Sequence, residues 1–300
     1  MDERFCKVGD VELCYEPFGE PDRPTVLLVM GLGTQMIGWH ADFCANLADR
    51  GFYVIRYDNR DVGHSTHLSD RPAPKPREII TRRIKRPAYL LKDMADDGIG
   101  LLDELGIDSA HVVGASMGGM IAQTMAAHHS DRVRSLVSIM SSTGSRWSGQ
   151  PAPRILPVFL QKPASGRDAY VERIVKLFKL IGSPGFERDD GELRELAGVS
   201  WDRGIDPAGF ARQLGAVIAS GHRAADLKRI RVPTLVIHGK SDRLIRPSGG
   251  RATARAIPNA RLELIEGMGH DLPRGVWPRI LDGIEQTAAR AAEPEAQPAA

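Results

Sequence analysis

One short motif in this chain carries the residue types that nucleophilic catalysis needs. Gly114-Ala115-Ser116-Met117-Gly118 is a G-x-S-x-G pentapeptide, with an apolar run before it and a proline-free run, residues 117–128, after it. This order predicts a strand that turns sharply into a helix with Ser116 at the apex. Gly114 and Gly118 lack a Cβ, so the strand and the helix can approach closely. The free amides at the start of the helix then lie beside Ser116, available to a developing negative charge.

A serine nucleophile needs a base, and the base needs an acid that orients it. Where a strand, turn and helix carry the serine in this way, the chain order is serine, acid, histidine. Residues 233–239 predict a short buried strand, and the loop behind it contains Asp242. Residues 261–269 predict another strand and a glycine-rich loop, and His270 follows at once. We therefore expect Ser116, Asp242 and His270 to meet at the carboxyl ends of the strands.

Other acids and histidines fit these roles less well. The alternative role for Asp242 is to cap a helix expected at 247–256. Asp271 adjoins His270 in sequence, and adjacent side chains point apart. His238 ends a strand and is interpreted as a packed histidine or one that supports the site from outside. None of the nine histidines has a metal-ligand spacing to a neighbouring Glu, Asp or Cys, so we expect no metal and no cofactor.

Four segments at expected strand ends match the pattern of a known family. They are Val29-Met30-Gly31-Leu32-Gly33, Arg56-Tyr57-Asp58-Asn59-Arg60-Asp61, His111-Val112-Val113-Gly114 and Gly267-Met268-Gly269-His270. With the serine motif, they make the chain resemble serine α/β-hydrolases over nearly its whole length. Within that superfamily it is most similar to bacterial carboxylesterases of the aclacinomycin methylesterase type.

The resemblance implies an α/β-hydrolase fold, with a mainly parallel eight-stranded sheet flanked by helices and a helical lid insertion. It also assigns an oxyanion hole. One donor is the backbone N–H of Met117, the residue after the nucleophile, and the other is the Leu32 amide. Met30 replaces the histidine that commonly starts the Leu32 loop. The motif at residues 58–65 is expected to be structural, with Asp58 and Arg60 holding turns near the site.

Apolar periodicity alternates strands and helices along the chain. Strands are expected at 5–7, 11–15, 25–30, 53–57, 111–113, 135–140, 233–239 and from 261, and helices at 38–50, 89–105, 117–128, 247–256 and 276–290. Residues 1–142 and 223–290 would form the α/β-hydrolase core, and residues 143–222 a helical lid. Residues 291–300, rich in Pro and Ala, are expected to be a disordered tail. The basic loop 71–86 is interpreted as a solvated excursion.

Two apolar helix faces are expected in the lid. They are Tyr170, Ile174, Phe178 and Ile181, and Phe210, Leu214, Val217 and Ile218. Asp206-Pro207 predicts the start of the second helix. The faces either pack the helices on the core or line an apolar pocket for the acyl or alcohol part of a substrate.

Net charge, apolar runs and cysteine positions indicate which partners and which compartment to expect. The net charge of +2 implies no nucleic acid and no anionic membrane, and a homodimer stays open. No apolar leader or membrane-spanning run is seen. A hairpin turn at residues 9–10 would place Cys6 opposite Leu13 and Cys14 opposite Phe5, on opposite faces of the ribbon. Unpaired cysteines favour the cytoplasm.

These features together predict hydrolysis of a small-molecule carboxylic ester through an acyl-enzyme. Small to medium esters, or methyl esters of bulkier acids, are the expected substrates. A C–C bond hydrolase or lactonase and a cofactor-free perhydrolase share the same triad and remain alternatives. A ligand-binding protein without catalysis is a more remote one. Asp at the position of Ser116 would have indicated an epoxide hydrolase or a haloalkane dehalogenase.

Overall fold

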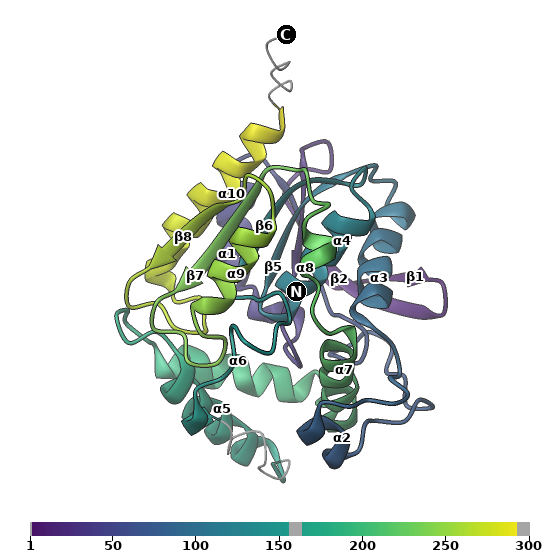
Figure 1. Cartoon of the computed structure of the whole chain (residues 1–300), viewed down its shortest axis with the longest axis vertical. Helices are drawn as coiled ribbons and strands as arrows, with labels where there is room; N and C mark the ends of the chain where they lie inside the picture. The colour runs from purple at the N-terminus through teal and green to yellow at the C-terminus, as the bar shows by residue number, and fades with distance from the viewer. Residues whose placement is uncertain (1, 156–163, 293–300) are drawn as a thin grey trace.

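An eight-stranded sheet runs through the centre of the computed structural model, which describes residues 2–155 and 164–292 (Figure 1). The strands are β1 (Arg4–Val8), β2 (Val11–Phe18), β3 (Thr25–Val29), β4 (Tyr53–Tyr57), β5 (Ala110–Ala115), β6 (Val133–Ile139), β7 (Thr234–Gly239) and β8 (Arg261–Ile265). Their order is β1-β2-β4-β3-β5-β6-β7-β8. Strands β3 to β8 pair in parallel, whereas β2 pairs antiparallel with β1 and β4. The predicted fold class is confirmed.

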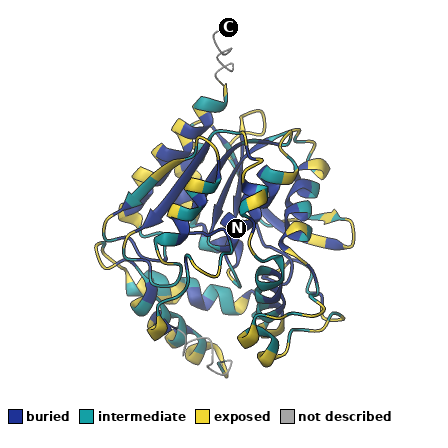
Figure 2. Ribbon diagram, viewed as in Figure 1, coloured by how far each residue is buried: buried dark blue, intermediate teal, exposed yellow. Residues whose placement is uncertain are grey.

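The two faces of the sheet carry separate apolar cores, because successive strand residues point to opposite faces. In β3, Leu27 and Val29 join one core, and Val26 and Leu28 join the other. Helices α3 (Leu91–Glu104) and α4 (Met117–His128) cover the first face, and α1 (Ala41–Ala48) and α10 (Trp277–Ala292) cover the second. Short α8 (Ala224–Leu227) and α9 (Ser248–Ala256) pack beside α4 and β7. Figure 2 shows the buried strands between these helices.

The first hairpin has the predicted register. Phe5 pairs with Cys14, Cys6 pairs with Leu13, and all three cysteines are free thiols. Burial raises the pKa of the Cys14 and Cys44 thiols to about 12. Both are therefore neutral at physiological pH and poor nucleophiles, since the thiolate is the reactive form.

Between β6 and α8, the described residues form three helices that lie at the carboxyl ends of the strands (lower part of Figure 1). They are α5 (Arg167–Ile181), α6 (Asp190–Asp202) and α7 (Pro207–Ser220). The apolar faces predicted on α5 and α7 are mostly not the buried ones. Helix α7 buries Gly209, Arg212, Gln213, Gly215 and Ala216, whereas Phe210, Leu214, Val217 and Ile218 are half-buried. The reason is that polar groups of the core bind Arg212 and Gln213, as described below. On α5 the buried residues are Val171, Val175 and Ile181.

Other differences from the sequence expectations concern boundaries. The helix expected at 38–50 is divided into a 3-10 turn, η1 (Met36–Gly38), and α1. The loop 71–86 contains a short helix, α2 (Pro76–Thr81), because the Glu78 carboxylate accepts hydrogen bonds from the Lys75 and Lys85 amides. Another 3-10 turn, η3 (Arg274–Val276), precedes α10, which continues to Ala292. The rest of the expected tail, 293–300, lies outside the described residues. No helix in the described parts of the chain is both long and apolar enough to cross a membrane.

Candidate active site

Ser116 lies at the junction of β5 and α4, with φ of 57° and ψ of −119°. A positive φ is unfavourable for a residue with a side chain, so the surroundings must hold this conformation. A Cβ on Gly114 would lie 2.1 Å from the carbonyl oxygen of Gly118, and a Cβ on Gly118 would lie 2.1 Å from that of Val29. Glycine is therefore required on both sides of the turn, as the sequence predicts.

The structure brings Ser116, His270 and Asp242 into one hydrogen-bonded row. His270 Nε2 lies 3.0 Å from Ser116 Oγ, and His270 Nδ1 lies 2.7 Å from Asp242 Oδ2. Asp242 and His270 are buried, while Ser116 is partly exposed. The amide of His270 donates to the carbonyl oxygen of Ile181 at 2.8 Å, so the end of α5 holds the histidine loop. An imidazole between a hydroxyl and a carboxylate can accept the hydroxyl proton during nucleophilic attack.

The Asp242 carboxylate is oriented by its own loop. Its Oδ1 accepts hydrogen bonds from the amides of Leu244 and Ile245, each at 2.9 Å, which leaves Oδ2 for His270. Burial raises the pKa of Asp242, but the neighbouring His270 and His238 imidazoles and their hydrogen bonds lower it further, to about 2. The carboxylate is therefore ionised over the whole working range of an esterase.

Two residues considered as alternatives lie close to this row without joining it. His238 is fully buried, and its Nε2 lies 2.7 Å from the Ile245 carbonyl oxygen and 3.4 Å from Asp242 Oδ2. This placement agrees with a packed histidine that supports the acid. Asp271 turns away to the Ser183 hydroxyl, which in turn accepts a hydrogen bond from the Gly269 amide. Asp271 thus belongs to the histidine loop and leaves Asp242 as the partner of the base.

The two amides expected to form the oxyanion hole belong to segments next to Ser116. Met117 is the first residue of α4, and Leu32 follows β3 in a loop that closely approaches the serine. A Cβ on Gly31 would lie 3.1 Å from Ser116 Cβ. Within the residues that the structure describes, neither amide donates a hydrogen bond to a protein acceptor. Both donors therefore remain available to a ligand oxygen beside Ser116.

Comparison with known proteins agrees with this geometry. A family model described as alpha/beta hydrolase fold matches residues 24–273. The chain belongs to this family. It is 29% identical over 297 residues to rhodomycin D methylesterase DauP of a Streptomyces species, covering 92% of this chain and 94% of the relative. It is 28% identical over 259 residues to 3-oxoadipate enol-lactonase 2 of Acinetobacter baylyi, covering 86% of each. The enol-lactonase structure from Burkholderia xenovorans superposes with a TM-score of 0.72 at 27% identity, covering 97% of this chain and 100% of that one.

These relatives identify the chain as an esterase-type hydrolase. The methylesterase match also confirms the resemblance to the aclacinomycin methylesterase type.

The family motif after β4 holds the hydrolase loops together, but not entirely as expected. Asp58 accepts hydrogen bonds from the Met36 amide at 2.6 Å and the His64 amide at 3.0 Å, so it does hold two turns. Arg60 is structural, as expected, but it joins the motif to a helix: its guanidinium pairs with both oxygens of Asp97 on α3, at 2.6 and 2.5 Å. A charge-assisted bidentate pair of this kind offsets the cost of burying the guanidinium. Asn59 Nδ2 donates to the carbonyl oxygen of Met30 at 3.1 Å, at the start of the Leu32 loop.

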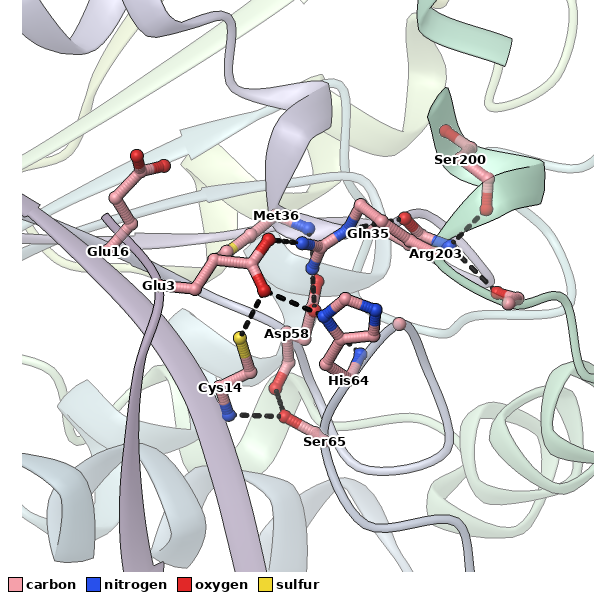
Figure 3. A network of polar contacts seen from close by, with 12 residues as sticks. Glu3, Cys14, Glu16, Gln35, Met36, Asp58, His64, Ser65, Ser200 and Arg203 are labelled. Carbon is pink, nitrogen blue, oxygen red and sulfur yellow. Dashed lines mark hydrogen bonds and ion pairs between the residues drawn. The ribbon is translucent and has the colours of Figure 1, made fainter. Parts of the chain in front are cut away.

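Helices α6 and α7 are tied to this motif by buried polar side chains that the sequence analysis missed. At the end of α6, Arg203 contacts Glu3 and Asp58, and its Nε donates to Gln35 Oε1 at 2.9 Å (Figure 3). On α7, Arg212 pairs with Asp61 at 2.9 and 2.7 Å. The available signal was weak: one arginine between apolar residues in a helix, which normally indicates a solvent-facing position.

Two groups of side chains have the types and spacing to consider as metal ligands. Glu3, Cys14 and His64 form one group and Asp61, His67 and Asp206 the other, with ligand atoms within 4.8 Å of one another. Sequence spacing could not reveal them, because each group joins distant segments. In each group an arginine already supplies positive charge: Arg203 contacts Glu3, and Arg212 lies 2.7 Å from Asp61 and 2.9 Å from Asp206. Both arrangements are satisfied as ion pairs.

Proposed function

We propose that this hydrolase cleaves carboxylic esters through an acyl-enzyme on Ser116. The observation that carries the proposal is the row Ser116 Oγ, His270, Asp242 Oδ2, with separations of 3.0 and 2.7 Å. His270 takes the serine proton during attack and later gives it to the leaving alcohol. Asp242 keeps the histidine in the required tautomer and stabilises the imidazolium.

The oxyanion formed in each step is assigned to the amides of Leu32 and Met117. A preorganised donor of this kind contributes roughly 3 kcal/mol to transition-state stabilisation. Water then gives a proton to the same histidine and attacks the acyl carbon. The acid is released and the proton returns to Ser116 Oγ. All groups required for both half-reactions are protein groups, so the proposed reaction includes no metal or cofactor.

The substrate we propose has a small or medium acyl group, or is the methyl ester of a bulkier acid. The Phe210 ring lies against the Leu32 loop, since a Cβ on Gly33 would lie 2.5 Å from Phe210 Cδ2. The half-buried Leu214, Val217 and Ile218 continue this apolar surface along α7. Relatives named as methylesterases support the methyl ester. Relatives named as enol-lactonases support a second candidate, a lactone, which is an internal ester open to the same chemistry.

We further propose a small-molecule ester as the partner and the cytoplasm as the compartment. The three free thiols fit a reducing environment.

Acyl chain length tests the substrate class. We expect good turnover of p-nitrophenyl acetate or butyrate and little turnover of the palmitate, because Leu32 and Phe210 restrict the space beside the acyl carbon. The measurement is kcat/KM across a series of p-nitrophenyl esters, with methyl esters of aromatic acids and a lactone alongside. A steady rise to palmitate, with activation at an oil–water interface, would instead identify a lipase.

A further inference from the structure

The loop that carries the Leu32 amide is a tight turn whose central peptide is held by the lid. The Thr34 amide donates to the Gly31 carbonyl oxygen at 3.2 Å, so residues 31–34 form the turn and the Leu32–Gly33 peptide is its centre. Gly33 has φ of +63°, a value that suits glycine at the third position of a turn. Turn types differ mainly in which way this central peptide points. The Leu32 N–H belongs to the peptide just before this centre, Gly31–Leu32, so the conformation of the turn decides where that N–H lies relative to Ser116.

Gln213 of α7 fixes that orientation. Its Oε1 accepts a hydrogen bond from the Gly33 amide at 2.8 Å, and its Nε2 donates to the Arg60 carbonyl oxygen at 2.8 Å. The side chain is fully buried, and the two partners determine which end is oxygen and which is nitrogen. A buried amide with both ends satisfied is a rigid bridge. It joins the lid to the turn on one side and to the family motif on the other.

Further contacts hold the same turn against the lid. The Phe210 ring, one helical turn before Gln213, lies against the Cα of Gly33. On the other side of the turn, Gln35 donates to the carbonyl oxygens of Ser200 and Gly204 at 2.8 and 2.9 Å. Figure 3 shows how Arg203 joins Gln35 to Glu3 and Asp58 in this second attachment. The turn is thus attached to α7 at Gly33 and to the end of α6 at Gln35.

We propose that Gln213 is a positioning residue for the oxyanion hole. It anchors the turn at its central peptide through the Gly33 amide, and thereby fixes the place of the adjoining Leu32 N–H beside Ser116, from the lid. The inference rests on the proposed function, since it assigns the Leu32 amide to that hole. Without the Gln213 oxygen, the Gly33 amide loses its acceptor and the turn can relax, because glycine imposes little steric restriction. The Leu32 N–H, in the adjoining peptide, then shifts away from its place beside Ser116. Displacement of the donor weakens binding of the transition state more than binding of the ester.

The test is Gln213→Met, which keeps the length of the side chain and removes both polar ends. Two reversible inhibitors are compared: a trifluoromethyl ketone, which forms a tetrahedral oxyanion adduct with a serine, and the corresponding amide, which is bound without reaction. We expect kcat for p-nitrophenyl acetate and affinity for the ketone to fall together by about ten- to one-hundredfold. KM and affinity for the amide should change by less than about threefold. If Gln213→Met does not fold, Gln213→Asn takes its place in the test. Its side chain is one methylene shorter, so its amide cannot reach the Gly33 N–H, and the expected results are the same.

Gln123→Met is the matched control. Gln123, on α4, is also fully buried. Its amide group donates to the Ser138 hydroxyl at 2.9 Å and accepts a hydrogen bond from Arg223 at 3.2 Å, and it has no hydrogen bond to residues 31–34. The Gln123→Met variant should have a lower Tm than the wild type, but the same ratio of ketone affinity to amide affinity. Equal loss of both inhibitors in Gln213→Met, or no loss of ketone affinity in a folded variant, would overturn the role of Gln213. If the ketone forms no adduct with the wild-type hydrolase, the proposed serine chemistry itself has failed.

Discussion

Ser116→Ala is expected to lower kcat for p-nitrophenyl acetate by about four to six decades, as deletions within such triads do. The change removes the only atom that forms the acyl bond and adds no bulk to the turn. Since Ser116 is partly exposed, Tm should stay close to the wild-type value. Stopped-flow and long-time assays on purified protein, with circular dichroism for the fold, measure both quantities.

His270→Ala should cost about as much as Ser116→Ala, and the double variant should cost little more, because the two residues act as a unit. His238→Ala is the control: His238 contacts Asp242 but not Ser116, so we expect a loss below about tenfold. Retention of more than a tenth of the wild-type rate in Ser116→Ala would exclude this serine as the nucleophile.

Asp242→Asn is expected to lower kcat by about four decades, less than the loss of the serine. The substitution keeps the shape but removes the negative charge 2.7 Å from His270 Nδ1. The imidazolium is then no longer stabilised, and the amide favours the wrong tautomer. The measurement is kcat across pH on wild type and variant. Because Asp242 is ionised above about pH 4, the loss in the variant should persist across the neutral and alkaline range.

The same carboxylate links stability to pH. The pKa of Asp242 is about 2 in the folded protein and 3.8 ordinarily, so its contribution is present above about pH 4 and is lost as pH falls through 2. The shift corresponds to about 2 kcal/mol of unfolding free energy. Asp242→Asn should lack this acid-dependent part of the stability in urea unfolding measured between about pH 2 and pH 5. Equal pH dependence in wild type and variant would contradict a depressed pKa.

The residues of the candidate site could be located from sequence because each depends on a local pattern. Ser116 lies between two glycines, at each of which a Cβ would come within 2.1 Å of a carbonyl oxygen. Asp242 and His270 each follow a short apolar strand and a turn that contains glycine. Parallel strands bring their carboxyl ends to one edge, so the chain order alone was enough to predict the meeting. The same locality explains why the bounds of β4 and α4 matched the expected ranges.

The contacts that hold the site residues in place could not be predicted from local patterns. Gln213 and Arg212 bind groups about 150 to 180 positions earlier in the chain, and a single sequence gives no sign of such pairings. Helical periodicity grouped Phe210 and Leu214 on one face of α7 but left open whether that face packs on the core or lines a pocket. In the structure the buried face contains Arg212 and Gln213, because Asp61 and the Gly33 amide provide their partners. Hydrophobicity alone could not indicate which face of the helix is buried.

The central claim is that Ser116 forms the acyl-enzyme, and trapping that intermediate tests it most directly. The hydrolase is mixed with p-nitrophenyl butyrate, quenched in acid during turnover, digested and examined by mass spectrometry. We expect a butyryl adduct on the peptide that contains Ser116, absent from Ser116→Ala and strongly reduced in His270→Ala. Turnover without any adduct under conditions where deacylation is rate-limiting, or an adduct on another residue that survives Ser116→Ala, would contradict the account.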